Sequence, residues 1–418
     1  MAEILLLPFG SAGDVFPFIW LGRQLMARGH RVRMITACLF EEQARKAGIE
    51  FISLGERDEF EAMIRDPRIW KSGIGTKVVF EFAAKSVEPY LVAIESCGKV
   101  DLMLAPVTAF AGRLAREKHG IPLITVHLQP AVFLSVHETP LLHPVMRLFN
   151  KLPVWCKKLI FELPNPVDLF ALPKVRRICE ANGVKPPRSL WREWWDSPDG
   201  VLALFPAWFA QPQPDWPANL LQWTFPLEDL ATEQTLQPEL QAFLANGERP
   251  VIFTPGSANV QASRFFAVAA EAVKRIGCRA VFVTREPKQV PPNLPASILT
   301  VEYAPFSTLL KHAAVFVHHG GIGTLSQGFA AGVPQLIMAM AHDQPDNADR
   351  LERLGAGIGL SVRQFTPERV VGCLKRLLED VAFRQTSLAC AVKIRQDRDP
   401  AALMSWIEAR MAHPPTPT

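Results

Sequence analysis

Short hydrophobic runs alternate with longer amphipathic stretches along this chain, in two series separated by an irregular segment. In each series an apolar run predicts a buried strand and the stretch after it predicts a helix, which is typical of parallel sheets. The first series predicts strands over 3–9, 31–37, 101–106 and 122–128, and helices over 15–30 and 109–120. The second predicts strands over 250–257, 279–285, 296–305, 313–321 and 333–339, and helices over 264–278, 322–332, 347–357 and 366–380.

The irregular segment, 128–225, lacks a clean period and is rich in Pro, Trp and Phe. Six of the ten tryptophans fall between 191 and 223, and the prolines between 206 and 217 would break a helix. We interpret it as the end of a first domain and a linker. The sequence thus predicts an N-terminal domain over 1–215, a C-terminal domain over 225–395 and a helix over 398–412 that crosses back to the first domain.

Two such series predict an α/β protein of two doubly wound, Rossmann-like domains that face each other. Sheets of this kind bind ligands at the carboxyl ends of their strands, so the cleft between the domains is the predicted site. The length of 418 residues agrees with two domains. A content of 49% hydrophobic and 21% charged residues is sufficient for two buried cores.

Charge, cysteine content and hydropathy narrow the class of protein. The net charge is +4 with no long Lys or Arg run, which disfavours a nucleic-acid partner. The seven cysteines are scattered without a CxxC pair, which indicates reduced thiols and not a disulfide framework or a zinc site. The first apolar run resembles a strand more than a signal peptide, and no run is long enough to span a membrane. We therefore expect a cytoplasmic protein.

The segment 314–337 places two histidines and several glycines between an apolar strand and a helix. Glycine lets the backbone approach a ligand closely, and the free amides and dipole of a helix start attract an anion. The pattern predicts a phosphate or diphosphate at Gly321–Thr324, with His319 donating a further hydrogen bond. A plain turn with incidental histidines is the alternative. A metal site at His318 and His319 is disfavoured, because adjacent side chains of a strand point to opposite faces.

Three further features support a ligand at the same edge. Gly256 and Ser257 form another glycine turn after a strand, and this turn would face the same cleft. Asp343 and Gln344 pair a carboxylate with an amide, which can together bind sugar hydroxyls, and a solvated loop is the alternative. Tyr303, one of only two tyrosines, can offer its ring to a nucleobase, and a core tyrosine is the alternative.

The order of these motifs, aromatic-x-Pro, HHGGxGT, GVP and DQ, resembles the donor-binding signature of nucleotide-sugar glycosyltransferases. The family is the inverting, metal-independent UDP-glycosyltransferase group with the GT-B fold, and the stretch FGSAGDVFPFIWLGRQLMARGHRV is similar to its N-terminal motif. Within that group, GSAGDVFPF, LFPAWFAQPQPDWP and AHDQPDNADRLERLG are most similar to the catalytic rhamnosyltransferase of rhamnolipid synthesis. Sterol and macrolide glucosyltransferases of bacteria and fungi are a little less similar.

The resemblance implies donor-binding roles for the residues that match these motifs. The residues at the phosphates would be His319, Gly321, Gly323, Thr324, Gly256 and Ser257. Those at the base, ribose and sugar would be Tyr303, Gln327, Asp343 and Gln344. Gln327 stands where many members have a Glu for the ribose, so its contact would be uncharged. The resemblance implies a UDP- or dTDP-sugar as co-substrate, such as UDP-glucose or dTDP-rhamnose, with no metal and no cofactor.

The acceptor hydroxyl in such a reaction needs a general base, and Asp14 is the candidate. It follows the first strand and comes at the start of the first helix. The alternative is that Asp14 only caps a helix that begins at Val15 or Phe16. The resemblance favours catalysis, because bacterial and sterol-type members have Asp at this position. A helix start lowers the pKa of a carboxylate, which would leave a weak base, and a single displacement would invert the anomeric centre.

The acceptor side is assigned to the N-terminal domain, with Phe16, Phe133 and His137 as candidate contacts. The segment 129–161 is apolar with a basic edge. Such a segment can line a lipophilic pocket or lie on an anionic membrane surface, and helices packed on the core are the alternative. We expect a lipophilic acceptor with a free hydroxyl, and contact with the inner face of a membrane stays open.

Other classes of protein fit the sequence less well. A dinucleotide-binding domain is disfavoured, because GSAGDV is not GxGxxG and the second strand ends without the acidic residue that binds the ribose. The predicted function is transfer of glucose, rhamnose or another hexose or deoxyhexose from a UDP- or dTDP-sugar to a lipophilic hydroxyl. A non-hydrolysing nucleotide-sugar epimerase and a catalytically silent, nucleotide-sugar-binding partner subunit are the alternatives.

Overall fold

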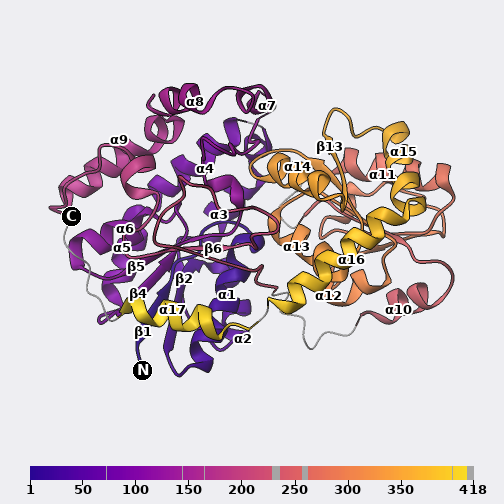
Figure 1. Cartoon of the computed structure of the whole chain (residues 1–418). Helices are drawn as coiled ribbons and strands as arrows, with labels where there is room; N and C mark the ends of the chain where they lie inside the picture. The colour runs from indigo at the N-terminus through magenta and orange to yellow at the C-terminus, as the bar shows by residue number, and fades with distance from the viewer. Residues whose placement is uncertain are drawn as a thin grey trace. The chain divides into compact units, whose positions relative to one another are not determined.

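The computed structural model describes residues 1–71, 73–143, 145–163, 165–227, 236–256, 262–397 and 399–411. Two compact units account for them (Figure 1). The first unit contains residues 1–227 and 399–411, and the second contains residues 236–397. Ser257, which we expected at the phosphates, lies outside the described residues.

The first unit is built on a parallel sheet of seven strands in the order β3-β2-β1-β4-β5-β6-β7. Its strands are β1 Glu3–Leu6, β2 Arg31–Ala37, β3 Glu50–Leu54, β4 Leu102–Ala105, β5 Leu123–His127, β6 Val201–Leu204 and β7 Leu220–Trp223. The central strands β4, β5 and β6 are buried along their whole length, which is why they appear in the sequence as continuous apolar runs.

Helices surround this sheet, and their ends follow local sequence signals. They are α1 Ala12–Ala27, α2 Glu41–Lys46, α3 Arg57–Arg65, α4 Ile74–Lys85, α5 Val87–Ser96, α6 Phe110–His119, α7 Met146–Phe149, α8 Val154–Phe161, α9 Pro166–Ala181 and α17 Ala401–Met411. Helix α6 ends where Gly120 adopts a left-handed conformation, φ 66°. Helix α9 begins at Pro166, and the side chain of its N-cap residue Asn165 accepts a hydrogen bond from the Val167 amide.

The first unit extends beyond residue 215, where the sequence predicted its end. Strand β7 pairs in parallel with β6, with Val201 opposite Leu220 and Leu204 opposite Trp223. The prolines that suggested a linker lie in the connection between these two strands and not in the strands themselves. The edge strand β7 is only half-buried and short, so its apolar pattern is weak.

The second unit is built on a parallel sheet of six strands in the order β10-β9-β8-β11-β12-β13. Its strands are β8 Val251–Thr254, β9 Ala280–Val283, β10 Ile298–Val301, β11 Val315–His318, β12 Gln335–Ala339 and β13 Gly357–Ser361. Its helices are α10 Pro238–Ala245, α11 Ser263–Ile276, α12 Phe306–Leu309, α13 Ile322–Ala331, α14 Gln344–Leu354, α15 Pro367–Glu379 and α16 Val381–Gln396. The strand order reverses between β8 and β11, and this switch point is where α/β sheets bind ligands.

The C-terminal helix α17 belongs to the first unit (Figure 1). Leu403, Met404 and Ile407 are buried on it. Glu408 receives hydrogen bonds from Arg28, at 2.9 and 2.8 Å, and contacts the His30 Nε2 at 3.1 Å, both just after α1. The helix is therefore held by an apolar face and by an ion-pair cluster.

Candidate functional site

The glycine loop after β11 is shaped by a buried histidine. The His318 Nδ1 accepts a hydrogen bond from the Gly320 amide at 3.0 Å, and its Nε2 contacts the Gln335 Oε1 on β12 at 2.8 Å. The Gly320 φ is 94°, a left-handed conformation that favours glycine. Burial lowers the pKa of His318 to about 3, so the ring is neutral and carries its proton on Nε2. His318 therefore has a structural role, and a metal would have to displace both of these contacts.

His319 lies between two glycines that leave room for its ring. A Cβ added at Gly256 would lie 2.6 Å from the His319 Cε1, and one at Gly321 would lie 2.5 Å from the Nε2. Burial lowers the pKa of His319 to about 4, so this imidazole is also neutral. Its buried Nδ1 has no hydrogen-bond partner among the described residues. A buried polar atom of this kind requires a partner, and a bound ligand can supply one.

The start of α13 provides backbone donors beside this ring. The helix begins at Ile322, where the sequence predicted its start, and Gly321 is its N-cap. The amides of Ile322, Gly323 and Thr324 therefore have no acceptor within the helix. The first turn of α13 carries no acidic side chain. The unpaired amides and the helix dipole together favour an anion such as a diphosphate at this end.

The buried side chain of Gln344 stabilises the turn before α14 through hydrogen bonds to the backbone. Its Oε1 accepts hydrogen bonds from the Met340 amide at 2.9 Å and the Ala341 amide at 3.3 Å, and the side chain is buried. We expected Gln344 to bind a sugar together with Asp343. In the structure the carbonyl end of this amide already stabilises the turn, and His342 adopts the left-handed φ of 58°.

Asn347 connects this turn to the glycine loop, and the sequence reasoning missed it. Its Nδ2 donates to the Gly320 carbonyl at 2.9 Å and to the Asp343 Oδ2 at 2.7 Å. Asp343 is the N-cap residue of α14, four residues before Asn347, so the two side chains share one helix face. The spacing of four residues between Asp343 and Asn347 can be seen in the sequence and indicates that the two side chains are neighbours. The hydrogen bond from Asn347 to Gly320 depends on the packing of α14 against the glycine loop. The structure thus brings Asp343, Gly320 and His319 into one connected region.

Two other candidate donor residues lie at the edges of this region. Tyr303 follows β10, its exposed fraction is 39%, and the Arg285 guanidinium lies 5.8 Å from its ring centre. Gln327 is almost fully buried on α13, three residues after Thr324. The exposed ring of Tyr303 is compatible with base stacking. The ligand roles of both residues stay predictions.

The structure bears on the alternative role of Asp14, that of a helix cap. Helix α1 begins at Ala12 with Ser11 as its N-cap, and not at Val15 or Phe16. The Asp14 Oδ2 accepts hydrogen bonds from the Ser11 amide at 2.8 Å and the Ser11 Oγ at 3.0 Å. Asp14 thus takes the third position of a capping box and is not the cap itself.

The pKa of Asp14 is raised and not lowered. Burial of the carboxylate raises it, and this outweighs the two hydrogen bonds from Ser11, which lower it. We expected a lowered pKa from the effect of the helix start alone, without the opposing effect of burial. Asp14 as a whole residue is half-buried. A raised pKa makes Asp14 a better proton acceptor at neutral pH.

The candidate acceptor residues lie in three different environments. Phe133 is buried, stacks on Trp216 with ring centres 4.4 Å apart, and packs edge-on against His127 at 4.6 Å. Phe133 therefore belongs to the aromatic core, with little surface left for an acceptor. His137 is exposed, whereas Phe16 is half-buried on α1. A partly buried contact that the sequence did not indicate joins the His127 Nε2 to the Asp196 Oδ1 at 2.7 Å.

Two family models match parts of this chain. Residues 4–137 match the glycosyltransferase family 28 N-terminal domain, and residues 272–409 match the erythromycin biosynthesis protein CIII-like C-terminal domain. The O-mycaminosyltylonolide 6-deoxyallosyltransferase of Streptomyces fradiae is 28% identical over 99% of this chain and 100% of that protein. A sterol 3-beta-glucosyltransferase of Arabidopsis thaliana is 25% identical over 96% of this chain and 64% of that protein.

Solved structures show the same fold. The glycotransferase of kitacinnamycin has a TM-score of 0.75 at 21% identity, covering 98% of this chain and 99% of that one. The spinosyn rhamnosyltransferase SpnG complexed with thymidine diphosphate has a TM-score of 0.69 at 19% identity, covering 97% of this chain and 100% of that one.

The two parallel-sheet units define a GT-B fold. The chain is a nucleotide-sugar-dependent glycosyltransferase with a family 28 N-terminal domain and an erythromycin biosynthesis protein CIII-like C-terminal domain. The fold class and the enzyme class that the sequence predicted are thereby confirmed, and the resemblance to glycosyltransferases is supported by both matches.

Proposed function

We propose that this chain transfers a hexose or deoxyhexose from a UDP- or dTDP-sugar to a hydroxyl of a lipophilic acceptor. The curated relatives carry names of deoxyallosyl and sterol glucosyl transfer, so both sugar types and an apolar acceptor are represented among them. The spinosyn rhamnosyltransferase SpnG, which has the same fold, is complexed with thymidine diphosphate in one solved structure and with the spinosyn aglycone in another. Glucose and rhamnose are the sugars that we would test first.

The observation that carries the proposal is the unpartnered Nδ1 of His319 beside the start of α13. A neutral imidazole can donate one hydrogen bond without changing charge, and the amides of Gly323 and Thr324 add further donors. These groups would hold the diphosphate and stabilise the charge that develops as it leaves. The helix end would then serve in place of a metal, so we propose a reaction that needs neither a metal nor a cofactor.

The remaining donor contacts follow from the surroundings of this anion site. Tyr303 would stack on the nucleobase, and Gln327 would meet the ribose. Asp343 would bind sugar hydroxyls, with the amide of Gln344 beside it. Gly256 and Ser257 would close on the phosphates. A glycine at position 256 leaves room for the His319 ring, which is the proposed donor to the same phosphates.

Asp14 would act as the general base on the acceptor. Its carboxylate takes the proton of the acceptor hydroxyl, the oxygen bonds to the anomeric carbon, and the bond to the diphosphate breaks with both electrons going to the leaving group. A single displacement of this kind inverts the anomeric centre. Phe16 and His137 are the proposed acceptor contacts, whereas Phe133 would support the aromatic wall behind them. We propose that the reaction takes place in the cytoplasm.

A donor panel tests this function. The purified chain would be incubated with UDP-glucose, UDP-galactose and dTDP-rhamnose, each with a phenolic and a hydroxyacyl acceptor and with EDTA present. A glycosylated product together with free nucleoside diphosphate supports the proposal, and activity in EDTA supports a metal-free reaction. An isomerised sugar nucleotide without an acceptor would indicate an epimerase. Nucleotide binding without any diphosphate release would indicate a silent subunit.

A further inference from the structure

The segment 145–163 concentrates apolar side chains on the surface of the first unit. Monomeric proteins rarely expose large contiguous apolar patches without a function. The exposed large hydrophobic residues are Val145, Leu148, Leu152, Val154, Trp155, Leu159, Ile160, Leu163 and the neighbouring Leu169. They lie on α7, on α8, in the connections between them and at the start of α9, and we call them the α7–α8 surface.

Helix α8 has its polarity reversed relative to an ordinary surface helix. Trp155 is 65% exposed and Leu159 is 62% exposed, whereas Lys157 is only 2% exposed. Trp155 and Leu159 are four residues apart, so they share one face of the helix. In a surface helix that faces only water, the apolar stripe packs inward and the lysine points outward. The reversed arrangement indicates that this face meets an apolar environment.

The exposed side chains are held in place by defined contacts. Phe149 of α7 stacks on Phe161 of α8, with ring centres 5.8 Å apart and an interplanar angle of 11°. The Asn150 side chain donates to the Thr139 carbonyl at 2.7 Å. Arg192 donates to the Phe161 carbonyl at 3.1 Å and pairs with Glu162 at 2.9 Å. The two helices are therefore anchored at both ends, and their apolar residues are not exposed by fraying.

The charges beside the α7–α8 surface are mainly positive. Between Val145 and Leu163 the sequence has four basic residues and a single acidic one, Glu162, which is paired with Arg192. Lys151 and Lys158 are exposed next to the apolar side chains. Helices that lie in the interface of an anionic bilayer have this composition, with exposed Trp and Leu flanked by lysines.

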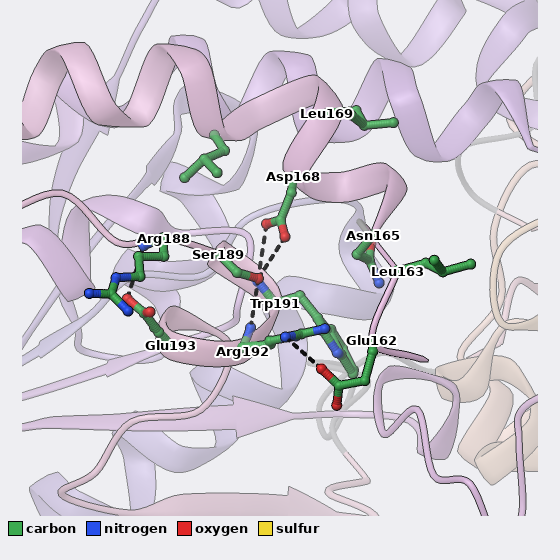
Figure 2. Close-up of a pocket in the computed structure, with 11 residues that line it drawn as sticks. Glu162, Leu163, Asn165, Asp168, Leu169, Arg188, Ser189, Trp191, Arg192 and Glu193 are labelled. Carbon is green, nitrogen blue, oxygen red and sulfur yellow. Dashed lines mark hydrogen bonds and ion pairs between the residues drawn. The ribbon is translucent and has the colours of Figure 1, made fainter. Parts of the chain in front are cut away.

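A hollow of about 500 Å³ adjoins this surface (Figure 2). Leu163 and Leu169 form part of its lining, with Trp191 opposite. Its carboxylates already have local partners, since Asp168 accepts from the Ser189 Oγ at 2.6 Å and Glu193 accepts from the Arg188 amide at 3.0 Å. The hollow thus does not offer a second catalytic centre, and only its leucines and Trp191 extend the apolar surface.

We propose that the α7–α8 surface binds the chain to an anionic phospholipid bilayer, lying in its interface. No helix within the described part of the chain is both long and apolar enough to cross a bilayer, so the contact would be peripheral. Trp155 and Leu159 would enter the acyl boundary, and Lys151 and Lys158 would meet the headgroups. The inference stands independently of the reaction that the chain catalyses.

Vesicle co-sedimentation of the full chain tests this proposal. We expect binding to vesicles of phosphatidylcholine mixed with phosphatidylglycerol, and much weaker binding to pure phosphatidylcholine or at high salt. The double variant Trp155→Ser, Leu159→Ser should lose at least about tenfold in binding. Lys151→Gln together with Lys158→Gln should lose roughly fivefold for each lysine, and only with anionic vesicles.

A matched control uses Leu388→Ser and Val392→Ser on α16, which have the same spacing and are 44% and 45% exposed. This variant should bind vesicles like the unchanged chain. Equal binding by the Trp155→Ser, Leu159→Ser variant would overturn the proposal. So would a concentration-dependent dimer that this variant abolishes, measured by analytical ultracentrifugation without lipid, because the surface would then contact a second copy. Melting temperatures identify any variant that fails to fold.

Discussion

Two ionisable residues, Asp14 and His319, have their pKa shifted by burial toward the neutral form. Burial raises the pKa of the Asp14 carboxyl and lowers that of the His319 imidazole to about 4. The shifts suit opposite tasks. A carboxylate with a raised pKa accepts a proton more readily, and a neutral imidazole donates a hydrogen bond to a phosphate through one defined tautomer. The environment of each residue thus determines its proposed role more than its type does.

His319→Ala should weaken donor binding and turnover together. The variant removes the proposed donor to the diphosphate, and hydrogen bonds to charged groups contribute about 1.5–3 kcal/mol, or roughly ten- to a hundredfold in kcat/KM. Calorimetry with UDP and dTDP and steady-state kinetics would measure both losses. The exposed His312, in the same unit, provides the control variant His312→Ala. Unchanged nucleotide affinity in His319→Ala would refute the assignment of this residue.

Asp14→Asn should stop turnover and leave nucleotide binding intact. Loss of a general base lowers kcat by roughly 10²–10⁴, and an Asn side chain can still accept the hydrogen bond from the Ser11 amide. Asp58→Asn, in the first turn of α3, is a matched control that should retain full activity. Retained activity in Asp14→Asn would show that another group takes the proton.

The pH profile provides a second test of Asp14. The carboxylate accepts a proton only when it is ionised, so kcat/KM should fall as the pH drops through its pKa. Because burial raises this pKa above the ordinary value of 3.8, the acid limb should lie at higher pH than for an exposed aspartate. An acid limb at or below pH 3.8 would contradict the raised pKa.

At the scale of elements, the ends of helices position the chemistry. The start of α13 supplies amides for an anion, and the capping box of α1 fixes the Asp14 carboxylate. Helix α14 contacts the glycine loop through Asn347, so hydrogen bonds link the turn at Asp343 to the loop. Helix α17 is held against the first unit by Glu408.

Glu408→Gln should loosen α17 without affecting the site residues of the second unit. The hydrogen bond from Arg28 lowers the pKa of Glu408 to about 2, so the stabilising interaction is present above the pKa of the unfolded chain, near 4.3. A partly exposed ion pair contributes about 1 kcal/mol or less to the free energy of unfolding. Urea titrations should show this difference at pH 7, and it should disappear as the pH falls from about 4 to 2. A constant difference across that range would mean that Glu408 acts through packing.

At the scale of the whole molecule, each unit is a parallel sheet whose functional residues follow its strands. Asp14 follows β1, and His319 follows β11 beside the reversal of strand order. The first unit carries in addition the α7–α8 surface, which adds a proposed membrane contact to the transferase fold. Vesicle binding would be a property of the folded molecule, because the surface combines two helices and their connections.

Much of this organisation follows from sequence periodicity alone. Alternating apolar runs predicted the two sheets, since a strand buried on both faces must be apolar along its length. The glycine spacing around His319 predicted a loop that a ligand can approach, and the structure adds that Gly256 and Gly321 leave room for this ring. Strands β3, β6, β7 and β13 were missed. Strands β3 and β7 are only partly buried edge strands and β13 contains glycine, so their apolar pattern is weak. Strand β6 is fully buried, but it lies within the proline- and tryptophan-rich segment that we interpreted as irregular.

The sequence by itself determined the fold class, the family resemblance and the positions of Asp14 and the glycine loop, because these depend on local patterns. Only the tertiary structure decided which atoms meet. The bonds from His318 to Gln335 and from Asn347 to Gly320 join elements far apart in the chain. The direction of the Asp14 pKa shift and the exposure of Trp155 were likewise decided by burial, which depends on what the rest of the chain covers.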